Sequence, residues 1–355
     1  MPSLTPRSIR TRLLILADTE GVRCLPDAHP LQPIDVVIHC GDITGTSQLS
    51  EYRTALQLLR AIDAPLKLVI PGNHDFTLDT PTFQHMCAKA SGSRLARIHQ
   101  LYGLPGQARQ LFADAAAAAR CEGGVTYLDE GTHRFALANG AELTVYASPY
   151  TPAFGSPGFQ YTVKEGHEFA IPDDVDVVVT HGPPRGVLDR SWATGQHVGS
   201  AELFTAVARA RPRVHCFGHI HEGWGAELVT WRDERERQGS SGSQGSVGSQ
   251  GSGSDQGATR NSSTVLADLG SILPLKGDAV DRVEEKERRL GEYARGKCVK
   301  TSHCAGDALP VEAGMNTLFV NAAVVGSPIR PPWVVDIELP VAEANAGFSG
   351  KDERS

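Results

Sequence analysis

The sequence predicts an α/β fold in which β-strands alternate with helices along most of the chain. Three observations support this prediction. Short apolar runs typical of buried strands recur between residues 12 and 217, and amphipathic or alanine-rich stretches lie among them. Polar side chains follow five of these runs directly, as in a sheet that carries a site at the carboxyl ends of its strands. The chain has 355 residues, 40% of them hydrophobic, which is enough to bury the core of one large domain.

The individual elements follow in order along the chain. Strands are predicted at 12–17, 35–40, 66–70, 175–180 and 213–217, and helices at 47–62, 81–120 and 200–210. Two runs at 132–137 and 142–146 are joined through Asn139-Gly140, a dipeptide that favours a tight β-hairpin. A last pair of strands near 317–320 and 333–338 is expected to close a second sheet.

Five short segments carry side chains that bind metal ions or move protons, and each segment comes at the end of an apolar run. They are Asp18-Thr19-Glu20, Gly41-Asp42, Gly72-Asn73-His74-Asp75, Thr180-His181-Gly182 and Gly218-His219-Ile220-His221. Their donors are oxygen and imidazole atoms, with no thiolate among them. This donor set suits two hard or borderline divalent ions, and it indicates metal-assisted hydrolysis.

Taken one at a time, the segments differ in specificity. Asp18 by itself is also explained as a strand-end or helix-capping aspartate, and Gly41-Asp42 is a common turn dipeptide. The segment from Gly218 to His221 gives the strongest local signal, because histidines two apart in an extended segment point to the same side and reach neighbouring ions. The ordered set of five is what favours a metal site.

This ordered set resembles the motif pattern of the calcineurin-like metallophosphoesterases. The resemblance is closer still to the small eukaryotic metallophosphoesterase-domain proteins, through residues 146–161, 180–189, 199–225 and 319–340. It covers nearly all of the chain except an insert at 233–313 and roughly the last dozen residues. The resemblance implies a four-layer α/β/β/α sandwich of two mixed sheets flanked by helices.

The resemblance also implies a role for each matching residue. Two divalent ions would share the Asp42 carboxylate. The implied ligands of the first ion are Asp18, Asp42 and His221, with Glu20 as a further ligand, and those of the second ion are Asp42, Asn73, His181 and His219. His74 would lie near the leaving-group oxygen as general acid or electrostatic stabiliser, and Asp75 would orient His74 through its ring nitrogen.

These roles imply a dinuclear metal-dependent phosphoric-ester hydrolase. Two ions about 3.5–4 Å apart can share a hydroxide that attacks phosphorus, so no covalent enzyme intermediate is required. The subfamily resemblance slightly favours a phosphodiesterase over a phosphomonoesterase. Two alternatives stay open. One is a metal-binding or nucleotide-binding scaffold of low turnover, and the other is a metallohydrolase or lyase that acts on a non-phosphate substrate in a specialised pathway.

Glu20 departs from the family pattern, which has histidine at this position. Glutamate is longer, negatively charged and harder as a ligand, so it favours Mn, Mg or Ca over Zn or Fe. The expected cofactors are therefore two divalent ions, with Mn first and Fe, Zn or Mg as alternatives. The other interpretation is that Glu20 turns away and leaves the first site weak or empty.

The chain is predicted to be one domain over 1–342, followed by a flexible tail at 343–355. A low-complexity and charged insert at 233–313 interrupts the domain and is expected to be largely disordered. Residues 239–263 are mostly Gly, Ser and Gln, whereas 281–297 carry charges that suit an exposed helix. The insert is either a tolerated expansion of a surface loop or an arm that docks a protein partner.

Composition limits the expected partners and compartment. The net charge of −7 argues against nucleic acid as a main partner, whereas bound metal ions would still attract a small phosphorylated substrate. No apolar stretch is long enough to span a bilayer and the N-terminal segment has no signal-peptide pattern, so no membrane partner is expected. Seven cysteines without a repeated spacing give no disulfide framework. These features favour a cytoplasmic enzyme.

Three further residues have alternative interpretations. Arg185 follows His181 in a short loop, where its guanidinium can clamp a second phosphate or a carboxylate of the substrate, or pair with Asp189 at the surface. His39 and His215 lie inside predicted strands and are explained more simply as hydrogen-bonded core histidines than as ligands.

Overall fold

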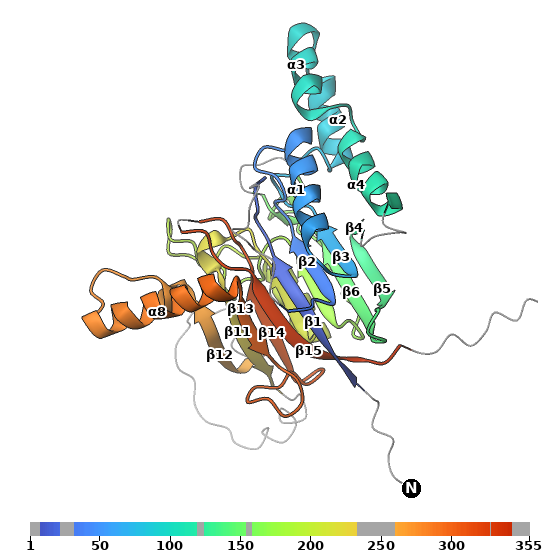
Figure 1. Cartoon of the computed structure of the whole chain (residues 1–355). Helices are drawn as coiled ribbons and strands as arrows, with labels where there is room; N and C mark the ends of the chain where they lie inside the picture. Colours follow the sequence, from blue (N-terminus) through green and yellow to red (C-terminus); the bar gives the residue numbers. More distant parts are fainter. Residues whose placement is uncertain are drawn as a thin grey trace, which may run out of the picture.

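Two mixed β-sheets form the centre of the molecule (Figure 1). The structure is a computed structural model that describes residues 8–21, 32–118, 124–153, 158–232, 260–326 and 328–342. A strand occurs at each predicted apolar run, and the expected β-hairpin is formed by Gly131–Ala136 and Glu142–Ser148. The described residues also form six strands that were not predicted. The predicted helical region at 81–120 is divided into three separate helices.

The first sheet has six strands in the order β13-β15-β1-β2-β3-β4. Their bounds are Val299–Ser302 (β13), Trp333–Pro340 (β15), Ser8–Leu16 (β1), Val36–Cys40 (β2), Leu66–Ile70 (β3) and Val125–Tyr127 (β4). Strands β1 to β4 are parallel to one another, and β15 runs antiparallel to β1. The four parallel strands therefore end at the same edge of the sheet.

The second sheet has seven strands in the order β12-β11-β14-β10-β9-β6-β5. Their bounds are Arg260–Asp268 (β12), Gly225–Trp231 (β11), Asn316–Asn321 (β14), Val214–Phe217 (β10), Val177–Thr180 (β9), Glu142–Ser148 (β6) and Gly131–Ala136 (β5). The central strands β6, β9, β10 and β14 are parallel. A small ribbon of β7 (Thr151–Pro152) and β8 (Gln160–Tyr161) follows β6.

Eight helical segments accompany the sheets in the described ranges. They are α1 (Leu49–Ala61), α2 (Thr80–Ala88), α3 (Gly92–Tyr102), α4 (Gln107–Ala118), α5 (Ala201–Ala210), the 3₁₀ turn η1 (His221–Gly223), α7 (Leu269–Ile272) and α8 (Val280–Gly296). Within the same ranges, no helix has both the length and the apolar character needed to cross a bilayer.

Helices cover the outer face of each sheet, and an apolar core fills the space between the sheets. Along β1, Leu13 and Ile15 point into this inner core, whereas Leu14 and Leu16 belong to a second core with α1 and α4. On the other side of the molecule, α5 packs on the second sheet. These layers form the α/β/β/α sandwich that the sequence predicts.

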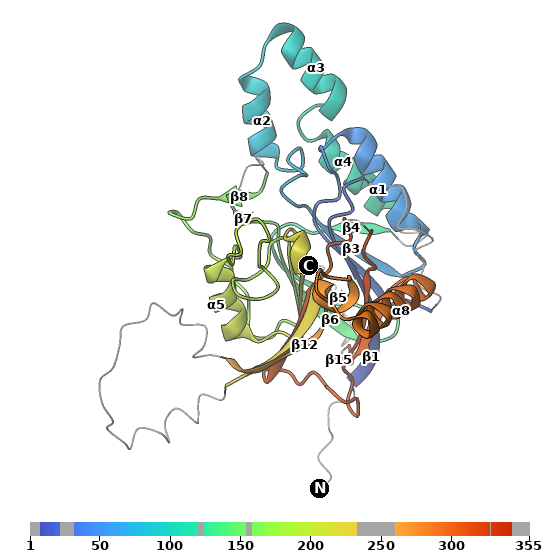
Figure 2. The ribbon, with the colours of Figure 1, turned by 90° about the vertical axis from the view of Figure 1, so that its left-hand side faces the viewer.

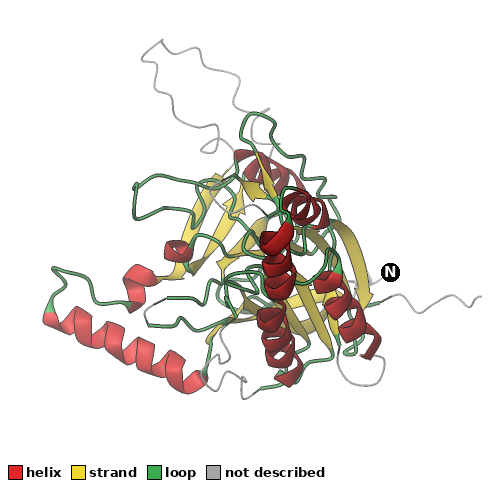
Figure 3. Cartoon of the chain, turned by 90° about the horizontal axis from the view of Figure 1, so that it is seen from above, coloured by secondary structure: helices red, strands yellow, loops and turns green. Residues whose placement is uncertain are grey.

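The expected insert is not a disordered unit where the structure describes it. Of residues 233–313, the part from 233 to 259 lies outside the described residues, as does the expected tail at 343–355. The remainder supplies β12, which pairs with β11, and β13, which pairs with β15. Between them, α8 extends outward at the edge of the sandwich, as expected for an exposed helix (Figures 1 and 3). Leu269 and Ile272 join the inner core, and this apolar burial orders the second half of the insert.

The last strand also differs from the prediction. β14 belongs to the second sheet as expected, but β15 crosses to the first sheet and pairs antiparallel with β1. The physical reason lies in the matching side chains of β1 and β15. Asp336 on β15 accepts hydrogen bonds from Arg12 Nε at 2.7 Å and from Arg10 Nη2 at 2.5 Å. Long-range charge pairing of this kind leaves no local pattern in the sequence.

Replacing Asp336 tests the pairing of β15 with β1 in the first sheet. Burial raises the pKa of Asp336, but the hydrogen bonds from Arg12 and Arg10 outweigh burial and hold the pKa below its usual value. We expect Asp336→Asn to lower the free energy of unfolding at pH 7 by about 1–2 kcal/mol. Most of this loss comes from Arg12, because Arg10 is 59% exposed and its pair is screened by solvent.

The pH dependence identifies the origin of this stabilisation. The folded pKa of Asp336 is lowered, so the stabilisation is fully present above the unfolded pKa of about 3.9 and is lost as the pH falls through the folded pKa. Urea unfolding of the native protein and of Asp336→Asn, at pH 7 and near pH 3, measures the difference between them. A difference that does not shrink at the lower pH would contradict the ionic origin.

Candidate metal centre

The loops that follow five parallel strands meet at one edge of the sandwich. β1, β2 and β3 of the first sheet end shortly before Asp18, Asp42 and Asn73, and β9 and β10 of the second sheet end shortly before His181 and His219. Hydrogen bonds and ion pairs between these residues connect the edges of the two sheets. The structure therefore brings together residues that are separated by as much as two hundred positions in the sequence.

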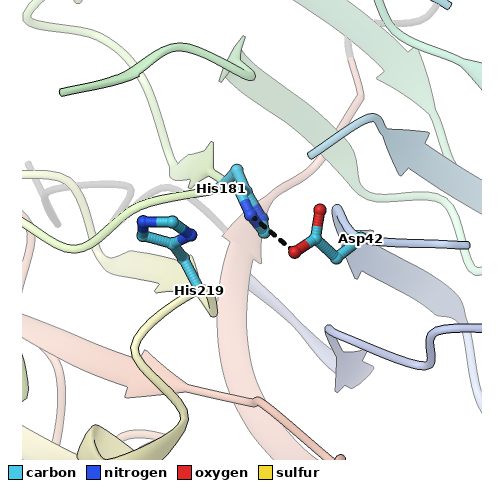
Figure 4. A group of neighbouring side chains, drawn as sticks. All are labelled: Asp42, His181 and His219. Carbon is cyan, nitrogen blue, oxygen red and sulfur yellow. Dashed lines mark ion pairs between the residues drawn. The ribbon is translucent and has the colours of Figure 1, made fainter. Parts of the chain in front are cut away.

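Asp42, His181 and His219 form the centre of this group (Figure 4). One donor atom from each lies within 4.8 Å of the others. His181 Nε2 is 3.2 Å from Asp42 Oδ2 and 2.9 Å from Asn73 Oδ1. The other ring nitrogen, Nδ1, donates a hydrogen bond of 3.0 Å to the carbonyl oxygen of Cys40. Nε2 is therefore the ring atom that faces the two oxygen atoms, and a positive charge at this position, carried by a proton on Nε2 or by a metal ion, satisfies all three atoms.

The pKa values of these three residues also indicate that the site stabilises positive charge. Burial lowers the pKa of His181, but the neighbouring Asp42 carboxylate outweighs burial and raises it to about 9. Burial raises the pKa of Asp42, but His181 and the other histidines outweigh burial and lower it to about 2. Burial lowers the pKa of His219 to about 4, which leaves its ring neutral and able to bind a metal ion at pH 7. Without a metal ion, the site thus combines an ionised Asp42 carboxylate with a protonated His181 and a neutral His219, and a metal ion would replace the proton on His181.

Asp18, Glu20 and His221 form a second group beside the first. The buried Asp18 carboxylate accepts hydrogen bonds of 3.1 and 3.0 Å from the backbone N–H of His219. His221 Nε2 is 3.4 Å from Asp18 Oδ1 and 3.8 Å from Glu20 Oε1. Glu20 therefore faces the other two residues and does not turn away from them. Its burial raises its pKa, because a desolvated carboxylate is less stable as an anion.

Two glycines of the motifs are required by the close approach of these carboxylates. A Cβ atom at Gly218 would overlap Asp18 Oδ2 and would lie 2.5 Å from Ala17 Cβ. A Cβ atom at Gly72 would overlap Asp42 Oδ1. Any side chain at either position would displace a carboxylate, so both positions need glycine.

His74 lies at the open side of the Asp42 group. Its side chain is 39% exposed, and Nε2 is 4.0 Å from Asp42 Oδ2. Nδ1 donates a hydrogen bond of 2.9 Å to the carbonyl oxygen of Gly45, which fixes the ring and leaves Nε2 facing the site. The backbone N–H of His74 donates to Asp42 Oδ1 at 2.8 Å. His74 is therefore held at two points and remains accessible to a substrate.

Asp75 does not have the expected role of orienting the His74 ring, because Gly45 has that role. The Asp75 carboxylate is completely buried and joins two loops. It accepts hydrogen bonds from the backbone N–H groups of Gly72, Ile43 and Thr44 and from the Thr44 hydroxyl, at 2.7 to 3.0 Å. Asp75 thus fixes the backbone on both sides of Asp42 and Asn73, and the sequence pattern alone does not show these partners.

The remaining predicted residues separate into two kinds. Arg185 is exposed, and it makes no ion pair with any residue that the structure describes, so the expected alternative partner Asp189 is not used. Asp189 instead accepts hydrogen bonds from Gly186 N, Gly199 N and His197. His39 and His215 are core histidines as expected, each hydrogen-bonded to a threonine hydroxyl at 2.9 Å. Burial lowers the pKa of His39 to about 4 and that of His215 to about 3.

Two residues that hold the histidine loop were missed by the sequence analysis. Asn321, at the end of β14, donates a hydrogen bond of 2.9 Å to the carbonyl oxygen of Ile220. Arg330, in the loop after β14, donates through Nη1 to the carbonyl oxygens of His221 at 2.8 Å and Val325 at 2.6 Å. The two side chains clamp consecutive carbonyl groups of the loop that carries His219 and His221. The only sequence feature that points to this role is the Asn-Ala-Ala sequence after an apolar run, and it is weak evidence.

The sequence profile of the calcineurin-like phosphoesterase family matches residues 16–223, which is more than half of the chain. The chain belongs to the calcineurin-like phosphoesterase family. The matched region begins at the end of β1 and ends at η1, so it contains all five metal-binding segments. Membership of this family confirms the expected resemblance.

Three known proteins are similar to this member of the family. A protein of Emericella nidulans named "Probable rhamnogalacturonate lyase C" is 32% identical over 217 residues, which are 59% of the chain and 18% of that protein. Human metallophosphoesterase domain-containing protein 1 is 32% identical over 226 residues, which are 61% of the chain and 62% of that protein. A UPF0046 protein of Caenorhabditis elegans is 30% identical over 209 residues, 56% of the chain and 49% of that protein. The chain spans less than two thirds of each of these relatives.

Removing the Arg330 guanidinium tests the clamp on the histidine loop. We expect Arg330→Met to lower the free energy of unfolding by about 1–3 kcal/mol, because two carbonyl oxygens lose their donor. Arg330→Lys keeps one donor and has a smaller effect. Urea unfolding measures the loss, with Arg53→Met on the exposed face of α1 as the control. Equal stability of Arg330→Met and the native protein would show that the clamp contributes nothing.

Proposed function

We propose that the chain is a dinuclear metal-dependent phosphoric-ester hydrolase, with phosphodiesters slightly favoured over phosphomonoesters. The observation that carries this proposal is the convergence of the Asp42 carboxylate, the Asn73 amide oxygen and the His181 and His219 rings, whose donor atoms lie close enough together to surround a cation. Family membership supports the reaction class. The preference for diesters rests on the similarity to the metallophosphoesterase-domain proteins.

The donor atoms of the two groups fit two divalent ions. Asp18, Glu20, Asp42 and His221 would hold the first ion, and Asp42, Asn73, His181 and His219 would hold the second. When bound, such ions activate water for attack and polarise the phosphoryl oxygens. The first set has three carboxylates and one imidazole, and oxygen-rich sets favour Mn over softer metals. We therefore propose Mn as the metal of the native protein.

His74 is proposed as the residue that protonates the leaving-group oxygen. Its Nδ1 is committed to the Gly45 carbonyl oxygen, so a proton for transfer has to come from Nε2. Nε2 lies 4.0 Å from Asp42 Oδ2 and therefore faces the site. Because the side chain is 39% exposed, a substrate can reach it.

Arg185 is proposed to bind a second anionic group of a phosphorylated substrate. It follows His181 by four positions in a loop whose shape is fixed by the buried Asp189. An exposed guanidinium at the end of such a loop, with no ion pair among the described residues, is available to a phosphate or a carboxylate.

Metal content and ester hydrolysis test the proposal together. Native protein loaded with Mn is expected to contain about two ions per chain and to hydrolyse bis(p-nitrophenyl) phosphate or p-nitrophenyl phosphate. His219→Ala should lose the second ion and Glu20→Ala the first, each with more than a ~10²-fold loss of turnover. Elemental analysis and initial rates give these values, with the exposed Arg60→Ala as control.

The outcomes of this experiment are distinct. Bound metal without turnover of either ester would favour a binding scaffold or a non-phosphate substrate over a phosphoesterase. The lyase named among the relatives does not decide between these, because the similar region is only 18% of that protein. A Glu20→Ala protein that keeps both ions and full turnover would show that Glu20 is not a ligand.

The role of His74 has its own kinetic signature. His74→Ala is expected to keep both ions and to lower kcat by about 10²–10⁴-fold with poor leaving groups, where protonation matters most. The loss should be smaller with p-nitrophenolate, which leaves without a proton. A series of aryl phosphodiesters with leaving groups of different pKa measures this dependence. An equal loss across the series would rule out proton donation by His74.

A further inference from the structure

A basic helical hairpin rises from the rim of the metal centre. It consists of α2 and α3, defined here as residues 80–102, which project away from the sandwich (Figures 1 and 2). From residue 80 to residue 113 the sequence contains no aspartate or glutamate, although it contains Lys89, Arg94, Arg97 and Arg109. The chain as a whole has a net charge of −7, so this segment is locally positive because it lacks acidic residues, in contrast to the rest of the chain.

Three of these cations are exposed near the tip of the hairpin. Lys89 is the C-cap residue directly after α2, and Arg94 and Arg97 lie in the first two turns of α3. None of the three forms an ion pair with a residue that the structure describes, whereas Arg109 pairs with Asp129. Arg94 lies near the amino end of a helix, where the helix dipole disfavours a positive charge. Helix stability therefore does not explain its presence.

The hairpin is joined directly to the loop that carries His74. The rings of Phe76, Phe83 and Tyr102 contact one another with centroid distances of 5.3 to 6.3 Å. Phe76 follows His74 by two positions, Phe83 belongs to α2, and Tyr102 is the last residue of α3. This aromatic cluster fixes the base of the hairpin against the metal centre. No residue of α3 is fully buried, so the rest of that helix is open to a partner.

We propose that the hairpin binds the phosphates of a single-stranded nucleic acid whose scissile ester lies at the metal centre. The inference rests on the proposed hydrolase function and specifies its substrate class. The nine residues of α2 span about 13 Å, so the cations at the tip lie on the order of ten ångströms from the His74 loop. A small ester cannot reach both places, whereas a chain of regularly spaced phosphates can.

An anionic membrane is an alternative partner, because it also attracts basic residues. The position of the hairpin makes a membrane less suitable than a nucleic acid. A flat membrane held at the tip of the hairpin would keep its lipid phosphates on the order of ten ångströms from the metal centre, out of reach of hydrolysis. The proposal departs from the expectation based on net charge, because binding of a polyanion depends on the local charge of the contact surface.

Binding is measured without hydrolysis, so that the proposal is tested independently of the enzymatic activity. The probe is a fluorescein-labelled single-stranded DNA 20-mer, titrated with the full chain in EDTA at 50 and 200 mM KCl. Three phosphate contacts give a slope of roughly −2 for log K against log salt, so native affinity should fall about 20-fold between the two salt concentrations.

A charge-reversed triple variant, Lys89→Glu with Arg94→Glu and Arg97→Glu, is expected to bind at least tenfold more weakly and with almost no salt dependence. The neutral variant with Gln at the same three positions should lie between it and the native protein. The matched control reverses Arg53, Arg60 and Lys164, three exposed cations outside the hairpin, and should bind like the native protein. Circular dichroism and thermal unfolding verify that each variant is folded.

Three results would overturn the proposal. These are native-like binding by the folded hairpin variant, an equal loss in the control variant, or no binding of the native protein at 50 mM KCl. Hairpin-dependent binding to phosphatidylserine vesicles without binding to the 20-mer would instead identify a membrane partner. Failure of the hydrolase proposal would leave oligonucleotide binding in EDTA unchanged, so the two failures are distinguishable.

Discussion

The carboxylates of Asp18 and Asp42 are buried where the two sheets meet, and a buried anion is stable only when donors or cations surround it. Asp18 is satisfied by the backbone of the His219 loop, and Asp42 by the His74 backbone and the His181 ring. Several of these contacts join a loop of one sheet to a loop of the other. The need to satisfy two buried anions thus determines how the loops meet.

A second layer of residues holds the loops in this arrangement. Asp75 accepts four hydrogen bonds from the loops around Asp42 and Asn73. Asn321 and Arg330 perform the same task on the histidine loop of the second sheet. Each of these side chains hydrogen-bonds to backbone groups of the loops, so the loops are fixed by the protein itself. The donor atoms are therefore already close together before a cation binds, which reduces the cost of binding it.

The additions to the basic sandwich lie at its edges. β12 and β13 extend the outer edges of the two sheets, where new strands form hydrogen bonds without disturbing the central parallel strands that carry the site. The α2–α3 hairpin extends from a loop next to the metal centre, and its aromatic base contacts that loop. An extension at a sheet edge changes the surface of the domain, whereas an extension at this loop changes the surroundings of the substrate.

Local patterns in the sequence determined the central strands, the β-hairpin and the candidate metal-binding residues. An apolar run followed by a donor residue is recognised in the sequence without information about distant contacts. Asp42, His181 and His219 were therefore all identifiable. The layered architecture was predicted by resemblance, whereas the order of the strands in each sheet was not.

Tertiary structure alone decided the features that depend on long-range pairing. These are the place of β15 in the first sheet, the ordering of the second half of the insert, the partners of Asp75, and the clamp formed by Asn321 and Arg330. Each joins groups that are far apart in the chain or uses backbone atoms, which every residue has. The residue whose backbone carbonyl accepts a hydrogen bond can be of any type, so its identity does not indicate the bond. Such a bond is recognised only in the folded structure.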